Sequence, residues 1–166
     1  MYDLVELFFF AYRDFVGDAD QVLINYEFGR AHHRVLHFVN RQPGLTIAEL
    51  LEILKITKQS LNRVLKELIA GSFIEVRAGA QDRRHRRLHA TPKGARLARE
   101  LAQVQTRRFL KATDMLGDDG RKKAAAFLLA MIDEGQRERV VTLIGAKDPA
   151  SGASYAPGAR EHGEKD

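Results

Sequence analysis

The sequence predicts a mainly helical domain that carries one small β-hairpin. Three observations support this fold class. Apolar residues recur at helical spacing along most of the chain, short capped helices follow one another in its middle, and two short runs have the pattern of strands. Apolar residues make up 45% of the 166 residues, which is enough for the core of one domain.

Residues 4–26 are predicted to form one long helix or two abutting helices, rich in aromatic side chains. Phe8, Phe9 and Phe10 lie in three directions around the helix axis, so apolar side chains nearly encircle its first turns. Such a helix is usually buried on two sides, and in a small protein a subunit interface provides the second side. A shorter helix is expected over residues 31–41.

Two short capped helices come next. Thr46 and Glu49 form a capping box, and apolar residues then follow at amphipathic spacing. Lys55-Ile56 is expected to form a short turn, and Thr57 is the expected N-cap of the second helix. Gly71 stands where a helix favours a left-handed C-terminal residue. Two capped helices joined by a turn of about three or four residues are typical of a helix-turn-helix.

The hairpin is predicted from two strand-like runs, residues 73–77 and 86–90, on either side of a turn-rich tip. Thr91 and Pro92 then provide the N-cap and the first-turn proline of another helix.

That helix is expected to run to about Leu116, and one last helix to reach about Ile144. Residues 146–166 hold glycines, prolines and mixed charges, which predicts a disordered tail.

Charge is distributed unevenly along the chain. The net charge is +5, but residues 1–40 carry a net −3 and residues 55–93 a net +7. A basic patch confined to one part of a chain is typical of nucleic-acid binding, although a solvated charged face has the same composition.

The second helix of the helix-turn-helix has a polar face opposite its apolar one. Gln59, Arg63 and Lys66 lie on this face, flanked by Asn62 and Glu67. Arginine, glutamine and asparagine suit base edges in the major groove of DNA. Thr57 and Ser60, near the helix N-terminus, suit contacts with phosphate. Any amphipathic helix has a polar outer face, so this pattern alone leaves the question open.

The hairpin tip is more specific. It carries four arginines within five positions, Arg83, Arg84, Arg86 and Arg87, which repel one another and contribute little to folding. An arginine-bearing hairpin suits the narrow, negatively charged minor groove. RNA or an acidic protein is an alternative partner for the same patch. The candidate DNA-binding residues are therefore Thr57, Gln59, Ser60, Asn62, Arg63, Lys66, Arg83, Arg84, Arg86 and Arg87.

Taken together, these residues resemble the MarR family of winged helix-turn-helix regulators. The resemblance rests on the segment from Leu50 to Gly71 and on the order Asp82-x-Arg84, Leu88, Thr91 and Gly94. The chain departs from the family pattern at Ala90, usually a larger apolar residue, and in its longer basic wing.

The resemblance implies one domain over residues 1–145, with the winged helix-turn-helix over about 30–95 and dimerisation helices over about 4–26 and 92–145. It also implies that Arg84 enters the minor groove, that Asp82 braces the wing, and that the helices from both termini form an intertwined homodimer. The expected partner is double-stranded DNA at a pseudo-palindromic site. A non-enzymatic interaction module that uses the wing on an acidic protein or RNA remains the alternative.

Many family members release DNA when a small aromatic ligand binds between the dimerisation helices and the DNA-binding lobe. Tyr12, Phe15, His33 and His37 are the candidate residues for such a cleft, although core packing explains them equally well.

Catalysis, cofactors and metal binding are not expected. His33 and His37 have the i, i+4 spacing of metal ligands, but no cysteine joins them and the nearest carboxylate, Glu27, precedes a break in the helix. Phosphate-binding loops and nucleophile motifs are absent from the sequence. The sequence has no apolar stretch of the length a membrane span needs, and Asp3 and Glu6 stand where a signal peptide is basic, which predicts a cytoplasmic protein.

Overall fold

The computed structural model describes residues 2–78 and 86–145. These residues belong to two compact units, which divide after Asp118. The first unit contains α1 (Tyr2–Leu23), the 3-10 turn η1 (Ile24–Tyr26), α2 (Arg30–Arg41), α3 (Ile47–Leu54), α4 (Lys58–Ala70), β1 (Ile74–Ala78), β2 (Arg86–Ala90) and α5 (Pro92–Asp114). The second contains α6 (Gly120–Ala130) and α7 (Glu134–Gly145).

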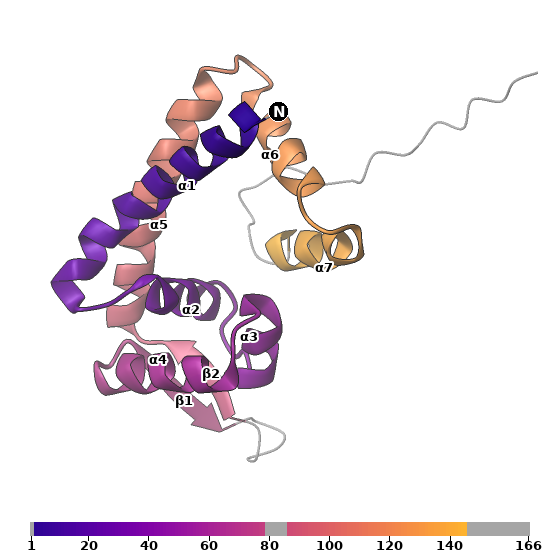
Figure 1. Ribbon diagram of the computed structural model, residues 1–166. Coiled ribbons are helices and arrows are strands. Elements are labelled where there is room, and N and C mark those ends of the chain that lie inside the picture. The colour runs from indigo at the N-terminus through magenta and orange to yellow at the C-terminus, as the bar shows by residue number, and fades with distance from the viewer. Residues whose placement is uncertain (1, 79–85, 146–166) are drawn as a thin grey trace, which may run out of the picture. The chain divides into compact units, whose positions relative to one another are not determined.

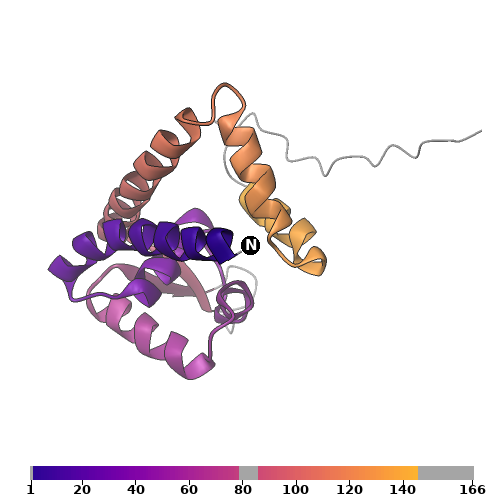
Figure 2. The same cartoon turned by 45° about the horizontal axis from the view of Figure 1, so that its top comes forward.

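A helical lobe forms the centre of the first unit. The helices α2, α3 and α4 pack together, and the β1–β2 hairpin lies against them (Figure 1). In Figure 2, α4, the magenta helix, lies at the outer edge of this lobe. The apolar faces that the sequence predicts for α3 and α4 are buried here: Leu50 and Leu54 come from α3, and Leu61, Val64, Leu65 and Leu68 from α4. The predicted helix-turn-helix is therefore the core of the lobe.

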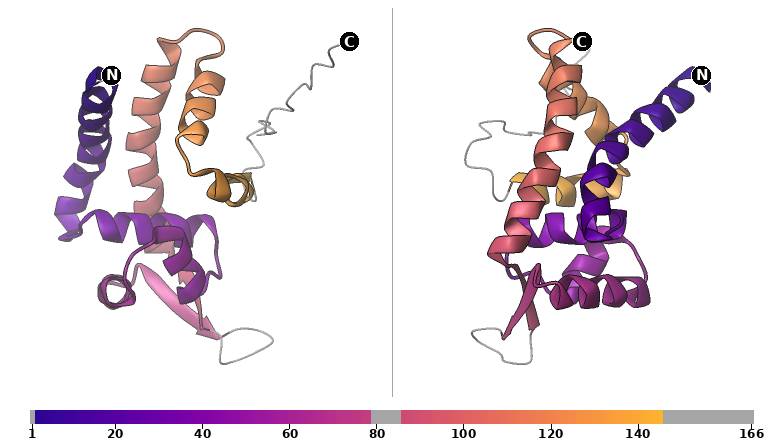
Figure 3. Two further views of the ribbon diagram at one scale, coloured as in Figure 1. Left: turned by 45° about the vertical axis from the view of Figure 1, so that its right-hand side comes forward. Right: turned by 90° about the vertical axis from the view of Figure 1, so that its left-hand side faces the viewer.

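The two long helices α1 and α5 lie side by side and lead away from the lobe, as both views of Figure 3 show. Phe15 of α1 contacts Phe109 of α5 with ring centroids 5.3 Å apart. Arg108 donates from Nε to the Asp18 carboxylate at 2.6 Å. The lower part of α5 enters the same core as the lobe through Leu97 and Leu101.

The hairpin has a single antiparallel register, in which Ile74 pairs with Ala90 and Ala78 with Arg86. A third segment extends it, because Leu45 and Leu88 form an isolated antiparallel bridge. Leu88 is only 1% exposed and anchors the hairpin in the core.

The predicted caps are confirmed. The Thr46 side chain accepts from the Glu49 amide, and the Glu49 carboxylate accepts from the Thr46 N–H at 2.7 Å. Thr57 and Thr91 cap α4 and α5 in the same way, accepting from the amides of Ser60 and Gly94. These caps depend on residues three apart, which is why local sequence predicts them.

Two predictions of local structure are wrong. Gly71 has φ −76°, and the left-handed residue after α4 is Ser72 at φ 59°. The expected last helix is also two helices, α6 and α7, separated at residues 131–133. Arg137 stabilises this break, since it donates to the carbonyl oxygens of Ala130 and Ile132 at 2.9 Å each.

No helix among residues 2–78 and 86–145 is long and apolar enough to cross a membrane. The predicted tail, residues 146–166, lies outside the described residues.

Candidate nucleic-acid interface

The predicted base-reading residues share the outward face of α4. Gln59, Asn62, Arg63 and Lys66 are all exposed, whereas the apolar positions between them are buried in the lobe. The amphipathic pattern thus produces a polar ridge on the outer side of the helix-turn-helix.

The N-terminus of α4 carries two hydroxyl groups in contact. Thr57 Oγ1 accepts from the Ser60 N–H at 3.2 Å and donates to Ser60 Oγ at 2.9 Å. In this arrangement the Ser60 hydroxyl accepts from Thr57 and keeps its own hydrogen for donation to a further acceptor, beside the positive end of the helix dipole. A phosphate oxygen is an acceptor of the kind that this end of the helix favours.

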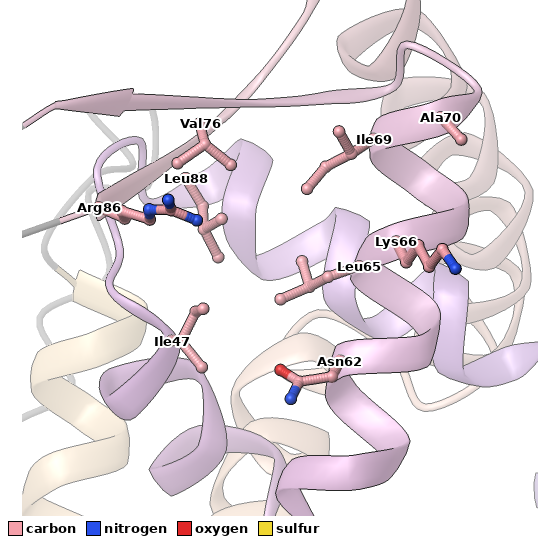
Figure 4. A pocket seen from close by; sticks show the side chains of 9 residues that line it. All are labelled: Ile47, Asn62, Leu65, Lys66, Ile69, Ala70, Val76, Arg86 and Leu88. Atoms are coloured by element: carbon pink, nitrogen blue, oxygen red, sulfur yellow. The ribbon is translucent and has the colours of Figure 1, made fainter.

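A groove of about 450 Å³ separates α4 from the hairpin. Figure 4 shows Asn62 and Lys66 on its α4 side and Arg86 on its hairpin side, with apolar side chains of both elements between them. These apolar side chains are Leu65 and Ile69 of α4 and Val76 and Leu88 of the hairpin. The groove therefore brings together three predicted site residues that are up to 24 positions apart in the sequence.

Arg87 is exposed, and it also forms a hydrogen bond with the backbone of another segment. It donates from Nη1 to the Gly44 carbonyl at 2.9 Å, next to the bridge between Leu45 and Leu88. This bond ties β2 to the segment before α3. Asp82, Arg83 and Arg84, the residues predicted to brace and form the wing tip, lie outside the described residues.

Two side chains that the sequence analysis did not assign to the interface hold α4 in place. Lys93 donates to the Gly71 carbonyl at 2.9 Å, directly after the last turn of α4. Glu67 of α4 contacts His32 of α2, with Oε2 2.5 Å from Nε2. Neither contact has a local signal, since the partners lie 22 and 35 residues apart.

The four residues proposed for a ligand cleft come from α1 and α2 but face different neighbours. Phe15 packs against Phe109 of α5. Tyr12 stacks on Phe8, with ring centroids 6.4 Å apart. Arg30 forms a bond of 2.8 Å with Asp20 on α1, which raises the pKa of Arg30.

The two histidines of that set lie on α2 with ring centroids 6.4 Å apart. Burial, with a smaller contribution from the neighbouring His37, lowers the pKa of His33 to about 4. Burial, followed by the charge of Arg41, lowers the pKa of His37 as well. Both rings are consequently neutral near pH 7, with one nitrogen that donates and one that accepts.

Comparison with known proteins agrees with this architecture. The family model described as "MarR family" matches residues 26–85. The chain is 47% identical over 133 residues, 80% of each chain, to the HTH-type transcriptional regulator PetP of Rhodobacter capsulatus.

Two solved structures share the fold. The reduced form of MarR from E. coli is 19% identical with a TM-score of 0.62, covering 78% of this chain and 96% of its own. A complex of S. aureus MepR with DNA is 21% identical with a TM-score of 0.61, covering 76% and 94%. Given the identity to PetP over most of its length and the family match across the helix-turn-helix, the chain belongs to the MarR family of winged helix-turn-helix transcriptional regulators.

Proposed function

We propose that this regulator binds a specific, pseudo-palindromic site in double-stranded DNA as a homodimer. The observation that carries the proposal is the groove between α4 and the hairpin, which sets Asn62 and Lys66 opposite Arg86. An exposed helix beside a basic hairpin suits the major groove and the adjacent minor groove of one duplex face. The fold shared with MepR, which was solved in complex with DNA, supports DNA as the partner.

The dimer part of the proposal rests on apolar surface. Phe8, Phe9 and Phe10 of α1 are exposed in a single chain, as are Phe109 and Leu110 of α5 and Phe127 and Leu128 of α6. Exposed apolar side chains in this number are typical of an interface between subunits. A two-fold dimer presents two copies of α4, which accounts for a pseudo-palindromic site.

We also propose that a small aromatic ligand controls DNA binding. Neutral His33 and His37 supply hydrogen-bonding groups on α2, and Tyr12 supplies a hydroxyl group on α1. A ligand that binds there and favours a different arrangement of α4 releases the DNA. A phenol titrated into the protein–DNA complex should then dissociate it, and more weakly so in His37→Phe.

The decisive experiment uses duplexes selected by the protein from random-sequence DNA, compared with unselected duplex across a salt series. A specific regulator binds the selected duplex well above a steeply salt-dependent background. Equal, salt-sensitive binding to all duplexes would contradict the proposal and favour an acidic protein or RNA as the partner of the wing. We place catalysis outside this function, since the family is one of transcriptional regulators and not of enzymes.

The wing provides a second test. Wild-type protein should prefer selected duplexes with A·T-rich flanks over G·C-rich ones, because a narrow minor groove concentrates negative potential. Arg84→Ala should lose most of this preference. It should change stability by no more than ~0.5 kcal/mol, because the sequence predicts an exposed position in the turn of the hairpin. Asp82→Ala should weaken binding indirectly, by loosening the wing. An Arg84→Ala protein that still discriminates between the flanks would remove the minor-groove role.

A further inference from the structure

Glu67 is the one acidic side chain on α4, the proposed recognition helix. It follows Arg63 and Lys66 on the exposed face, where a carboxylate repels phosphate. Its side chain is nevertheless held, because Oε2 lies 2.5 Å from Nε2 of His32. His32 belongs to α2, so this contact joins two helices of the lobe.

The hydrogen bonds of His32 define its tautomer. The Gly29 N–H, at the start of α2, donates to Nδ1 at 3.1 Å, so Nδ1 is an acceptor and carries no hydrogen. The ring hydrogen is then on Nε2 and donates to Glu67. The side chain of His32 is only 12% exposed, against 47% for that of Glu67. A largely buried donor thus points at a half-exposed acceptor on the binding face.

An aromatic cluster fixes the orientation of His32. Its ring stacks on Phe28, with centroids 4.6 Å apart and planes 7° apart. Phe28 contacts Phe73 at 5.0 Å, and Tyr26 contacts both.

The same cluster supports the second tie on α4. Lys93 lies with its ammonium 4.1 Å above the centre of the Phe73 ring while it donates to the Gly71 carbonyl. Both side-chain ties on α4 therefore rest on one group of rings, in which Tyr26 and Phe28 come from the end of η1 and the residues after it, and Phe73 directly precedes β1.

We propose that His32 is a positioning residue for DNA recognition, which acts by holding Glu67 and, through it, the rotation of α4 about its axis. The proposal rests on the proposed function of α4. A recognition helix has to hold its base-reading side chains within a fraction of an ångström of the positions from which they contact the bases. Supporting hydrogen bonds provide this precision. When Glu67 is bound to His32, its carboxylate also stays directed at α2 instead of at the phosphate backbone.

Two substitutions of His32 separate its two bonds. In His32→Asn, the amide oxygen stands near the position of Nδ1 and continues to accept from Gly29, but the side chain is too short to reach Glu67. In His32→Gln, the amide nitrogen stands near the position of Nε2 and continues to donate to Glu67. The helix cap is thus retained in one variant and the tie to α4 in the other.

DNA binding is measured on a duplex selected by the wild-type protein and on unselected duplex. His32→Asn should weaken the selected duplex by roughly threefold to tenfold, the range for one hydrogen bond to a charged group at a partly exposed site. His32→Gln should restore most of this affinity. In a Glu67→Ala background, His32→Asn should have little further effect, since the bond is already absent.

Two binding results would overturn the proposal. In one, His32→Asn binds the selected duplex like wild type; in the other, His32→Asn weakens binding equally with and without Glu67. Amide hydrogen exchange in the free, full-length protein tests the tie without DNA. His32→Asn should speed exchange in α4 more than in α3, and His32→Gln should not. Unchanged exchange in α4 would also contradict the proposal, whereas a wild-type protein that selects no duplex would contradict the proposed function alone.

Discussion

The half-buried histidine His33 makes stability depend on pH. Its pKa in the folded protein is about 4, below the ordinary value of 6.5 that it regains on unfolding. Between these two pH values the unfolded chain therefore binds more protons than the folded protein does. The contribution of His33 to the free energy of unfolding is at its full value above pH 6.5 and is lost as the pH falls toward 4.

We expect His33→Gln to reduce this dependence. Melting temperatures measured from pH 7 to pH 4 should fall less steeply in the variant than in wild type, and the two curves should run parallel above pH 6.5. The sign follows from burial, which disfavours the charged imidazolium of His33. Curves of equal slope below pH 6.5 would show that the folded protein accepts a proton on His33 without cost.

Gly94 permits a close approach between α5 and the hairpin. A Cβ at this position would stand 2.0 Å from the Phe73 carbonyl oxygen and 3.3 Å from Leu36 Cδ1. The start of α5 is held there, since the Thr91 hydroxyl donates to the Ser72 carbonyl at 2.7 Å. Gly94→Ala should therefore destabilise the protein by about 1–3 kcal/mol or more, as measured by denaturant unfolding.

Gly17 provides the matched control. It lies within α1, and a Cβ there meets nothing within 4 Å. Gly17→Ala should leave stability unchanged or raise it by about 0.5–1 kcal/mol, because alanine loses less entropy in a helix. Similar losses in both variants would mean that the cost at Gly94 is not steric.

At the scale of an element, the exposed face of α4 is expected to read bases. If Arg63 makes a bidentate base contact, Arg63→Ala should cost about 1–3 kcal/mol on the selected duplex and relax the preference at one base pair. The measurement is competitive binding against duplexes that vary at each position. Equal losses on selected and unselected DNA would identify Arg63 as a phosphate contact.

The hairpin element is expected to behave differently at Arg87. We expect Arg87→Ala to weaken all sequences alike and to flatten the salt dependence, as the loss of a phosphate contact does. Its bond to the Gly44 carbonyl adds a structural consequence, because the link between β2 and the segment before α3 is lost. A reduced melting temperature should accompany the weaker binding, and a change of base preference would contradict this assignment.

For the whole molecule, the exposed aromatic side chains of α1 predict a dimer at micromolar concentration. Phe9 is 63% exposed in the single chain, so Phe9→Glu should cost the subunit little but place a charge in the interface. Sedimentation equilibrium should find wild type dimeric and Phe9→Glu monomeric.

Val76 in the hairpin is a control of similar type, since it is exposed and lies beside α4. Val76→Glu should stay dimeric. A monomeric wild type would remove the dimer and, with it, the pseudo-palindromic site.

The family and most elements of the fold could be predicted from the sequence because their signals are local. Thr46, Thr57 and Thr91 cap residues three positions away, and the apolar spacing of α3 and α4 selects their buried faces. The same spacing also identified the outward residues of α4, such as Asn62 and Arg63, by exclusion. The order of these elements along the chain made the resemblance to a winged helix-turn-helix regulator specific.

The two wrong predictions concern places where the local sequence is compatible with more than one backbone conformation. Glycine is favoured in the left-handed conformation, but the chain turns at Ser72 instead, next to the bond between Lys93 and the Gly71 carbonyl. The break between α6 and α7 has no proline, and Arg137 stabilises it by bonding carbonyl groups on the preceding turn.

Local sequence patterns were enough to predict most of the helices and strands, the faces that they bury, and the family. The contacts that hold α4 could be seen only in the tertiary structure. His32 contacts Glu67, 35 residues away, and Lys93 donates to the Gly71 carbonyl, 22 residues away. His32 stacks on Phe28, and Lys93 lies over the ring of Phe73. The physical reason is that caps and amphipathic faces follow from neighbours along the chain. A hydrogen bond between distant side chains instead depends on the packing that brings them together.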